Sequence, residues 1–193
     1  MNLLKKIIES IKKENIFQTK EKLLLAVSGR VDTVVLCELW KQSGFDFVIA
    51  QCNLQLREAE SERDEKFVRE LANKYNVEIF VKKFETEKYA EENKVSIQVA
   101  ARELRYEWFA SLIDNKQYAI DNKEDGDNCQ LPIANWILTA HHANDNIETV
   151  LMNFYKGSGI AGLRGILTKH KKIIRTLLFA KKEGLEDLAK ENN

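Results

Sequence analysis

Two short polar segments carry residue types that could do chemistry. The first, residues 28–33 (SGRVDT), directly follows an apolar run. Hydroxyl groups, a glycine and unpaired backbone N–H groups at the start of a helix are suited to holding phosphate, because the helix dipole favours anions there. Asp32 could hold Mg²⁺ or cap the helix. The segment lacks the GxxxxGK[ST] spacing of a Walker loop, and taken alone it also fits an ordinary strand–helix turn.

The second segment, residues 141–149 (HHANDNIET), has acids and histidines at helical spacing. Asp145 and Glu148 are one turn apart and would share a helix face, where two carboxylates could bind Mg²⁺ or a substrate ammonium group. His141 and Asp145, four residues apart, could also serve as metal ligands. On spacing alone, capping by Asn144 with acids complementing the helix dipole is the favoured interpretation.

Apolar runs alternate with amphipathic stretches along the chain. Strands are expected at residues 22–27, 45–52, 77–81 and 136–140, with a further short strand near Tyr118. Helices are expected at residues 1–15, 33–41, 61–75 (opened by Ser61, with Asp64 in a near capping box), 96–115, 144–156 and 181–192. This alternation predicts an α/β fold, a parallel sheet with helices on both faces, whose ligands bind at the carboxyl ends of the strands.

Composition narrows the class of protein. With 193 residues, 44% of them hydrophobic and 31% charged, the chain predicts one globular domain over residues 1–193. No apolar run approaches the roughly 18 residues of a membrane span, and residues 1–15 lack the features of a signal peptide, so we expect no membrane association and a cytoplasmic location. Cys37, Cys52 and Cys129 are odd in number and form no CxxC pair, which argues against disulfides and cysteine-ligated metals.

Charge is distributed unevenly although the formal net charge is zero. Basic residues without any acid occupy the stretch between residues 164 and 182, and residues 121–128 are mostly acidic. Such runs are usually solvated faces or loops. The basic stretch becomes relevant if the substrate is RNA.

Several motifs together resemble one enzyme family. Residues 28–33 resemble the PP-loop pattern S-G-G-x-D-S, with Arg30 in place of the second glycine. Residues 140–166 (AHHANDNIETVLMNFYKGSGIAGLRGI) resemble the A-H-H-x-x-D-Q-x-E-T-x-L…G-x-G-x-x-G-L stretch of the tRNA(Ile)-lysidine synthetases. Residues 53–57, followed by Ser61 and Asp64, 101–106 and 174–178 resemble that family's N-H-x-L-R…S-x-x-D, A-R-x-x-R-Y and R-P-L-L segments. The resemblance spans roughly residues 20 to 190.

The resemblance implies a PP-loop, Rossmann-type sandwich and an ATP-dependent ligase that forms a carbon–nitrogen bond. Enzymes of this family use ATP to adenylate C2 of the wobble cytidine in tRNA(Ile) with a CAU anticodon, and free lysine then displaces AMP to give lysidine. It implies ATP and Mg²⁺ as cofactors, with tRNA(Ile) and lysine as partners. Oligomeric state is left open.

The resemblance also assigns roles to individual residues. ATP and Mg²⁺ would be held by Ser28, Gly29, Arg30, Val31, Asp32 and Thr33, with Asp32 as the magnesium ligand. Arg102 and Arg105 would reach phosphate or the activated base, Asp145 and Glu148 would hold lysine, and His141 and His142 would line the pocket. Gly157 and Gly159 would belong to a substrate-side loop. Their GxGxxG spacing follows a predicted helix and not a strand, so it does not indicate a dinucleotide site.

Departures from the family pattern define further expectations. Arg30 is expected to be unfavourable if the second glycine of the loop needs a positive φ, and Glu58 and Thr176 replace a glycine and a proline. The family usually continues into tRNA-binding domains, so we expect this chain to correspond to the catalytic domain, with residues 166–193 as a weaker helical extension. The alternatives are a tRNA 2-thiolation enzyme, which commonly has paired cysteines, and a degenerate nucleotide- or RNA-binding module without catalysis.

Overall fold

The computed structural model describes residues 3–14, 16–17, 20–114 and 133–191. Its helices are α1 (Leu3–Glu14), α2 (Val31–Ser43), α3 (Glu58–Tyr75), α4 (Thr86–Asn93), α5 (Ile97–Asp114), α7 (Ala143–Tyr155), α8 (Gly159–Gly162) and α9 (Lys182–Glu191). Its strands are β1 (Leu23–Ala26), β2 (Phe47–Asn53), β3 (Ile79–Lys83), β4 (Trp136–Leu138), β5 (Lys169–His170) and β6 (Ile173–Ile174). Within the described ranges, no helix has the length and apolarity needed to cross a membrane.

The strands form one sheet in the order β3-β2-β1-β4-β6-β5. All neighbouring pairs are parallel except β5 with β6, which is antiparallel. Since the connections between parallel strands must cross over the sheet, the intervening helices cover its faces. The predicted α/β class and parallel sheet are confirmed.

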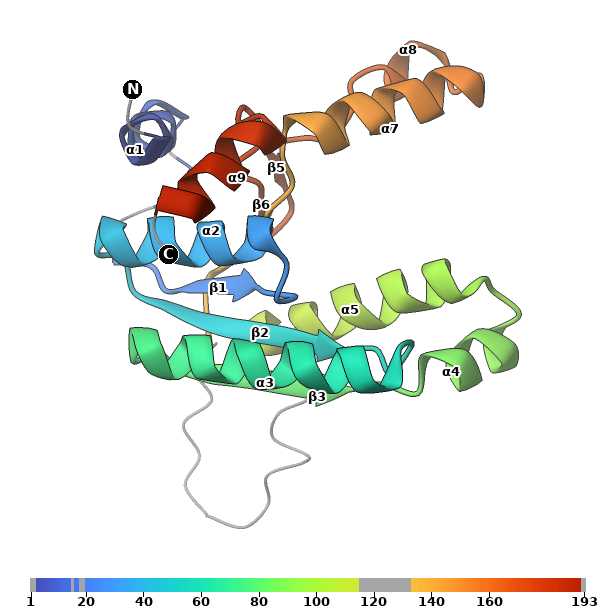
Figure 1. Cartoon of the computed structure of the whole chain (residues 1–193). Coiled ribbons are helices and arrows are strands. Elements are labelled where there is room, and N and C mark those ends of the chain that lie inside the picture. Colours follow the sequence, from blue (N-terminus) through green and yellow to red (C-terminus); the bar gives the residue numbers. More distant parts are fainter. Residues whose placement is uncertain (1–2, 15, 18–19, 115–132, 192–193) are drawn as a thin grey trace.

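Side chains of β1 alternate between two separate cores. Leu23 and Leu25 are fully buried in a core shared with α1, α2, α3 and α9. Leu24, equally buried, points to the opposite face and packs with residues of α5. A strand buried on both faces must be apolar at every position, which explains the continuous LLL run. Helices therefore cover both faces of the sheet, as the sequence predicted (Figure 1).

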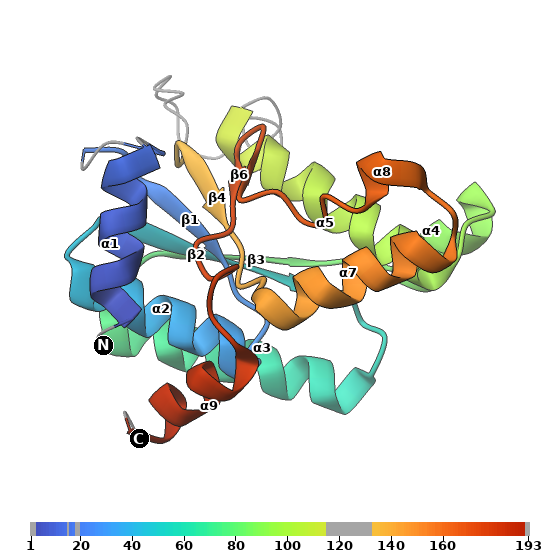
Figure 2. The same ribbon diagram turned by 90° about the horizontal axis from the view of Figure 1, so that it is seen from above.

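Both polar segments lie at the carboxyl ends of parallel strands. The phosphate-loop segment follows β1, and the histidine segment follows β4, which pairs directly with β1. Helices α7 and α8 project from the body of the molecule and are separated from α4 and α5 in Figure 1; the view from above shows that they extend toward the same side of the molecule as α4 and α5 (Figure 2). The exposed face of this α7–α8 arm is apolar, with Ile147, Leu151 and Phe154 at least half exposed.

Several predicted helix boundaries are wrong. Helix α2 begins at Val31 and not at Thr33. Helix α3 begins at Glu58, so Ser61 lies inside the helix and the predicted capping box does not form; Arg57 precedes the helix without any side-chain cap. Helix α4, an eight-residue segment rich in charge, was not predicted because it buries only Thr86 and Ala90 and has little periodic signal. The strand expected near Tyr118 lies outside the described residues.

Residues 166–191 contribute two strands and several core residues in addition to helix α9. Strand β6 pairs with β4 and extends the parallel sheet, and β5 closes its edge. Ile174, Leu177 and Leu185 are fully buried in the same core as α1 and α2. Strands of two residues leave no readable periodicity in the sequence, so only the final helix was predicted there.

Candidate active site

The phosphate loop is shaped by a glycine and a threonine. Gly29 has φ +81°, a conformation that side chains rarely adopt. A Cβ placed there would lie an ordinary 3.5 Å from the Cβ of Asp64, so backbone conformation, and not crowding, calls for glycine. The Thr33 hydroxyl donates to the carbonyl oxygen of Arg30 at 2.7 Å and accepts from the N–H of Ser28 at 3.4 Å. The loop is thus folded back onto the start of α2.

Arg30 does not occupy a left-handed position. It precedes α2 with φ −76° and ψ 154°, an extended conformation open to any residue, and its side chain is exposed. The expectation that arginine is strained at the second glycine position is therefore wrong, because the positive φ falls one residue earlier, at Gly29. The carbonyl oxygen of Arg30 accepts hydrogen bonds from the N–H groups of Thr33 and Val34, which closes the first turn of α2.

Asp32 lies in the first turn of α2, directly after the phosphate loop. Its side chain is only 16% exposed, and its Oδ1 atom is buried without a hydrogen bond from any described residue. A buried, unpaired carboxylate oxygen is costly unless a cation or donor joins it. Nowhere in the described ranges do three or more histidine, cysteine or acidic side chains gather as a metal site. A cation at Asp32 would therefore take its other ligands from water or from a bound molecule.

His142 joins the two polar segments. It caps α7, with its backbone N–H donating to Asp145 Oδ2 at 2.8 Å and its Nδ1 accepting from the Asp145 N–H at 3.4 Å. A neutral ring that accepts at Nδ1 carries its proton on Nε2. That atom lies 3.9 Å from Asp32 Oδ1, longer than a hydrogen bond.

The cap of α7 differs from the one expected. His142 takes this position, and Asn144 lies inside the helix, where its Oδ1 accepts from the backbone N–H of Lys182 at 3.1 Å. Asn144 thus ties the start of α7 to the start of α9. A histidine is an uncommon cap, so the residue type alone pointed to asparagine.

His141 lies where three further segments converge. Its Nδ1 is 2.8 Å from the Thr139 hydroxyl. Burial, followed by the positive charge of Arg175, lowers the pKa of His141 below its ordinary value, with smaller contributions from Arg102 and Arg105 and partial opposition from Asp145. The ring is therefore neutral at pH 7. Arg102 and Arg105 of α5 therefore lie close enough to His141 for their charges to act on it.

Arg175 is a site residue that sequence reasoning did not select. It follows β6, is 8% exposed, and donates from Nη1 to the carbonyl oxygen of Leu167 at 2.8 Å. Its Nε is buried and has no hydrogen bond within the described part of the chain. In the sequence, Arg175 is notable only as part of the basic stretch and of the R-P-L-L resemblance. The available signal was an arginine placed directly after the apolar pair of β6.

Asp145, Glu148 and the two loop glycines occupy different positions along α7 and the loop that follows it. Asp145 is engaged by the backbone of His142, whereas Glu148, one turn further along α7, is exposed and joins no ion pair among the described residues. Gly157 and Gly159, each with φ +66°, lie beyond the far end of α7. A helix of 13 residues is about 20 Å long, so these glycines are not brought to the phosphate loop.

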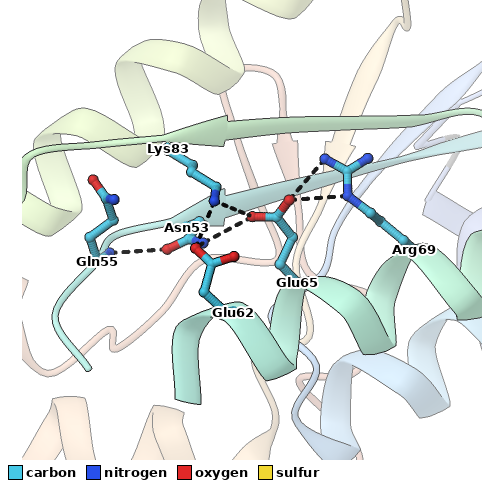
Figure 3. A network of polar contacts seen from close by, with 6 residues as sticks. All are labelled: Asn53, Gln55, Glu62, Glu65, Arg69 and Lys83. Carbon is cyan, nitrogen blue, oxygen red and sulfur yellow. Dashed lines mark hydrogen bonds and ion pairs between the residues drawn. The ribbon is translucent and has the colours of Figure 1, made fainter. Parts of the chain in front are cut away.

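A polar network missed by sequence analysis supports the end of β2 (Figure 3). Glu65 is buried and accepts from Asn53 at 2.9 Å and from Arg69 at 2.9 and 3.1 Å. Lys83 of β3 contacts Glu62 at 2.6 Å. Burial acts to raise the pKa of Glu65, but the hydrogen bonds from Asn53 and Arg69 outweigh it, and the pKa is lowered. The network fixes α3 against β2 and β3, and α3 carries Asp64 to Gly29.

Comparison with known proteins places this geometry in a family. The PP-loop domain family matches residues 2–193. A tRNA(Ile)-lysidine synthase of Bacteroides thetaiotaomicron is 40% identical over 178 residues, which cover 92% of this chain and 38% of that protein. One from Thermosipho africanus is 37% identical over 196 residues, covering 100% of this chain and 42% of that protein. The chain thus spans about two-fifths of the length of these relatives.

Solved structures agree on the fold. The U34-tRNA thiolase NcsA from Methanococcus maripaludis has a TM-score of 0.68 at 14% identity, over 97% of this chain and 62% of that one. The NH3-dependent NAD synthetase from Campylobacter jejuni has a TM-score of 0.59 at 14% identity, over 100% of this chain and 74% of that one. At such identities the likeness concerns the fold alone. The chain belongs to the PP-loop domain family, and its resemblance to the tRNA(Ile)-lysidine synthetases is confirmed.

Proposed function

We propose that residues 1–193 form the catalytic domain of a cytoplasmic ATP-dependent ligase that joins lysine to C2 of the wobble cytidine in tRNA(Ile) with a CAU anticodon. The observation that carries the proposal is the meeting of Asp32 and His142, 3.9 Å apart, at the carboxyl ends of the paired strands β1 and β4. Relatives named tRNA(Ile)-lysidine synthase, 33–40% identical over nearly the whole chain, support the same activity.

ATP would bind with its phosphates against the start of α2. The N–H groups of the first helical turn, the hydroxyls of Ser28 and Thr33, and the close backbone approach allowed by Gly29 suit a phosphate chain. Arg30 and Val31, both exposed, would flank it. In the first step a bond forms between the cytidine O2 atom and the α-phosphorus, and pyrophosphate leaves.

Asp32 would be the protein ligand for Mg²⁺, because its buried Oδ1 lacks a partner among the described residues. When bound, the ion neutralises charge on the phosphates of ATP. His142, held by the capping interaction with Asp145, would keep Asp32 oriented toward the loop.

The second step needs a bound amine and a leaving AMP. The amine nitrogen of lysine attacks C2, the C2–O bond to AMP breaks, and the amine loses a proton. Glu148, with a free carboxylate, and Asp145 would bind the lysine, while Arg102 and Arg105 would counter the negative charge of the departing AMP. Neutral His141 would line the pocket without repelling the lysine ammonium. Gly157 and Gly159 would contribute to the substrate-side loop.

The cysteines disfavour the thiolation alternative. Cys37 is fully buried, and burial raises the pKa of Cys52 to about 12. A thiol of this kind is not a ready thiolate nucleophile or metal ligand at neutral pH. Cys129 lies outside the described residues.

The proposal is tested by AMP release from ATP with unmodified tRNA(Ile) and lysine, each omitted in turn. AMP should appear only when both are present, and Asp32→Asn should lower its rate on the order of 100-fold. Asp187→Asn, the same change at an exposed site on α9, is the matched control and should have no effect. ATP binding without any AMP release from the complete mixture would instead identify a non-catalytic nucleotide-binding module.

A further inference from the structure

A hollow lies between α5 and the β5–β6 hairpin, outside the phosphate loop. Its volume is about 450 Å³. From α5 it is lined by Arg102, Tyr106, Ala110 and Ile113, and from the sheet edge by Ile137, residues 170–173 and Arg175. Arg102 and Arg175 are the same side chains whose charges act on His141. The hollow, termed here the α5 trough, therefore adjoins the candidate active site.

The trough is strongly cationic. Arg102, Lys171, Lys172 and Arg175 line it together with His170, and no acid is among its described lining residues. Lys171 and Lys172 are exposed and form no ion pair within the described part of the chain. By contrast, the hollow of about 430 Å³ between α2 and α3 is mostly apolar and combines Glu38 and Glu70 with one lysine. The two hollows of similar volume therefore differ in the charge of their lining.

Aromatic rings accompany these cations. The Arg102 guanidinium lies 5.0 Å from the centre of the Tyr106 ring. On the other face of the sheet, toward α1, the Lys169 and Lys172 ammonium groups lie 4.1 and 4.9 Å from the centre of the Trp136 ring, so the charge of Lys172 is held outside the trough. The contact with Tyr106 holds the Arg102 side chain without neutralising its charge. A guanidinium held against an aromatic ring suits a chain of phosphates and bases.

We propose that the α5 trough binds the phosphate backbone of the RNA substrate and guides the wobble nucleotide to the active site. This inference rests on the proposed tRNA substrate. Lys171 would contact a backbone phosphate at the hairpin, and Arg102 would contact the next phosphates at the inner end of the trough. Phosphate contacts position a nucleic acid without reading its sequence, which leaves the choice of base to the active site.

The test measures RNA binding directly and requires no catalysis. The intact chain is titrated against a fluorescein-labelled anticodon stem–loop RNA by anisotropy at several salt concentrations. The variant Lys171→Gln should weaken binding about threefold at low salt and lower the slope of log K against log salt by about 0.7, because one phosphate contact is lost. Calorimetric ATP binding should be unchanged, which shows that the variant is folded.

The matched control is Lys5→Gln, which removes one exposed lysine from α1, over the opposite face of the sheet. It should leave both affinity and salt slope unchanged. Equal weakening by both variants would mean that only overall charge matters and would overturn the proposal, as would an unchanged affinity of the trough variant. So would equally strong, trough-dependent binding of poly-glutamate. Since AMP release is measured separately, failure of the proposed reaction remains distinguishable from failure of the trough.

Discussion

The two halves of the candidate site are built in different ways. The phosphate loop is one continuous segment whose geometry comes from its own residues: the positive φ of Gly29 and the hydrogen bond from Thr33 to Arg30. The histidine half is assembled from distant segments. His141 follows β4, Arg175 follows β6, and Arg102 comes from α5.

The difference has consequences for substitution. In the local half, the sensitive position is the one whose backbone conformation is unusual. In the assembled half, the role of a side chain depends on whether neighbouring groups already form hydrogen bonds with it. Asp145 and Glu148 illustrate this, because the first is bonded to the backbone of His142 and the second has no partner in the described structure.

The largest effect expected in the comparison of these two acids is on the lysine KM. Glu148→Gln should raise the lysine KM on the order of 10-fold, a loss of ~1.4 kcal/mol, with little change in the ATP requirement, because a free carboxylate on α7 no longer pairs with the ammonium. Steady-state kinetics with lysine and ATP varied separately measure this. An impaired ATP requirement with unchanged lysine dependence would reassign Glu148 to the nucleotide.

Asp145→Ala is the contrasting variant. It removes the capping interaction of α7 and should cost about 1 kcal/mol of stability, lowering the melting temperature by about 2–4 °C. Glu148→Gln should leave the melting temperature unchanged. Equal melting temperatures for both variants would remove the distinction between the acids.

A smaller effect is expected within the phosphate loop. Gly29→Ala forces a side chain into φ +81° and should cost about 1 kcal/mol, seen as an approximately fivefold loss of Mg²⁺–ATP affinity in calorimetry. Arg30→Gly relieves no strain, since Arg30 is extended, and should bring no gain in affinity. A higher affinity in Arg30→Gly would show that the arginine side chain obstructs the phosphates.

The smallest effect concerns the charge of His141. Its pKa should be below the ordinary 6.5, so the ring stays neutral as the pH falls from 7 through that value. Because the unfolded chain takes up the proton first, the folded state loses stability below pH 6.5. Nitrogen-15 NMR titration measures the pKa directly. Arg102→Gln should raise it, since one nearby positive charge is removed, and an unchanged value would place Arg102 away from the site.

Local information in the sequence determined much of this protein. The LLL run predicted the central strand because a strand buried on both faces is apolar throughout, and the SGRVDT segment predicted an anion site because its residues form the loop by themselves. The family resemblance came from the same continuous motifs.

Tertiary structure alone decided the rest. The orphaned Oδ1 of Asp32 and the depressed pKa of His141 depend on residues far apart in the chain. The same holds for the Glu65 network and the α5 trough, whose halves come from α5 and the β5–β6 hairpin. Burial and charge proximity arise only when the sheet brings these segments together, and no periodicity along the sequence records them.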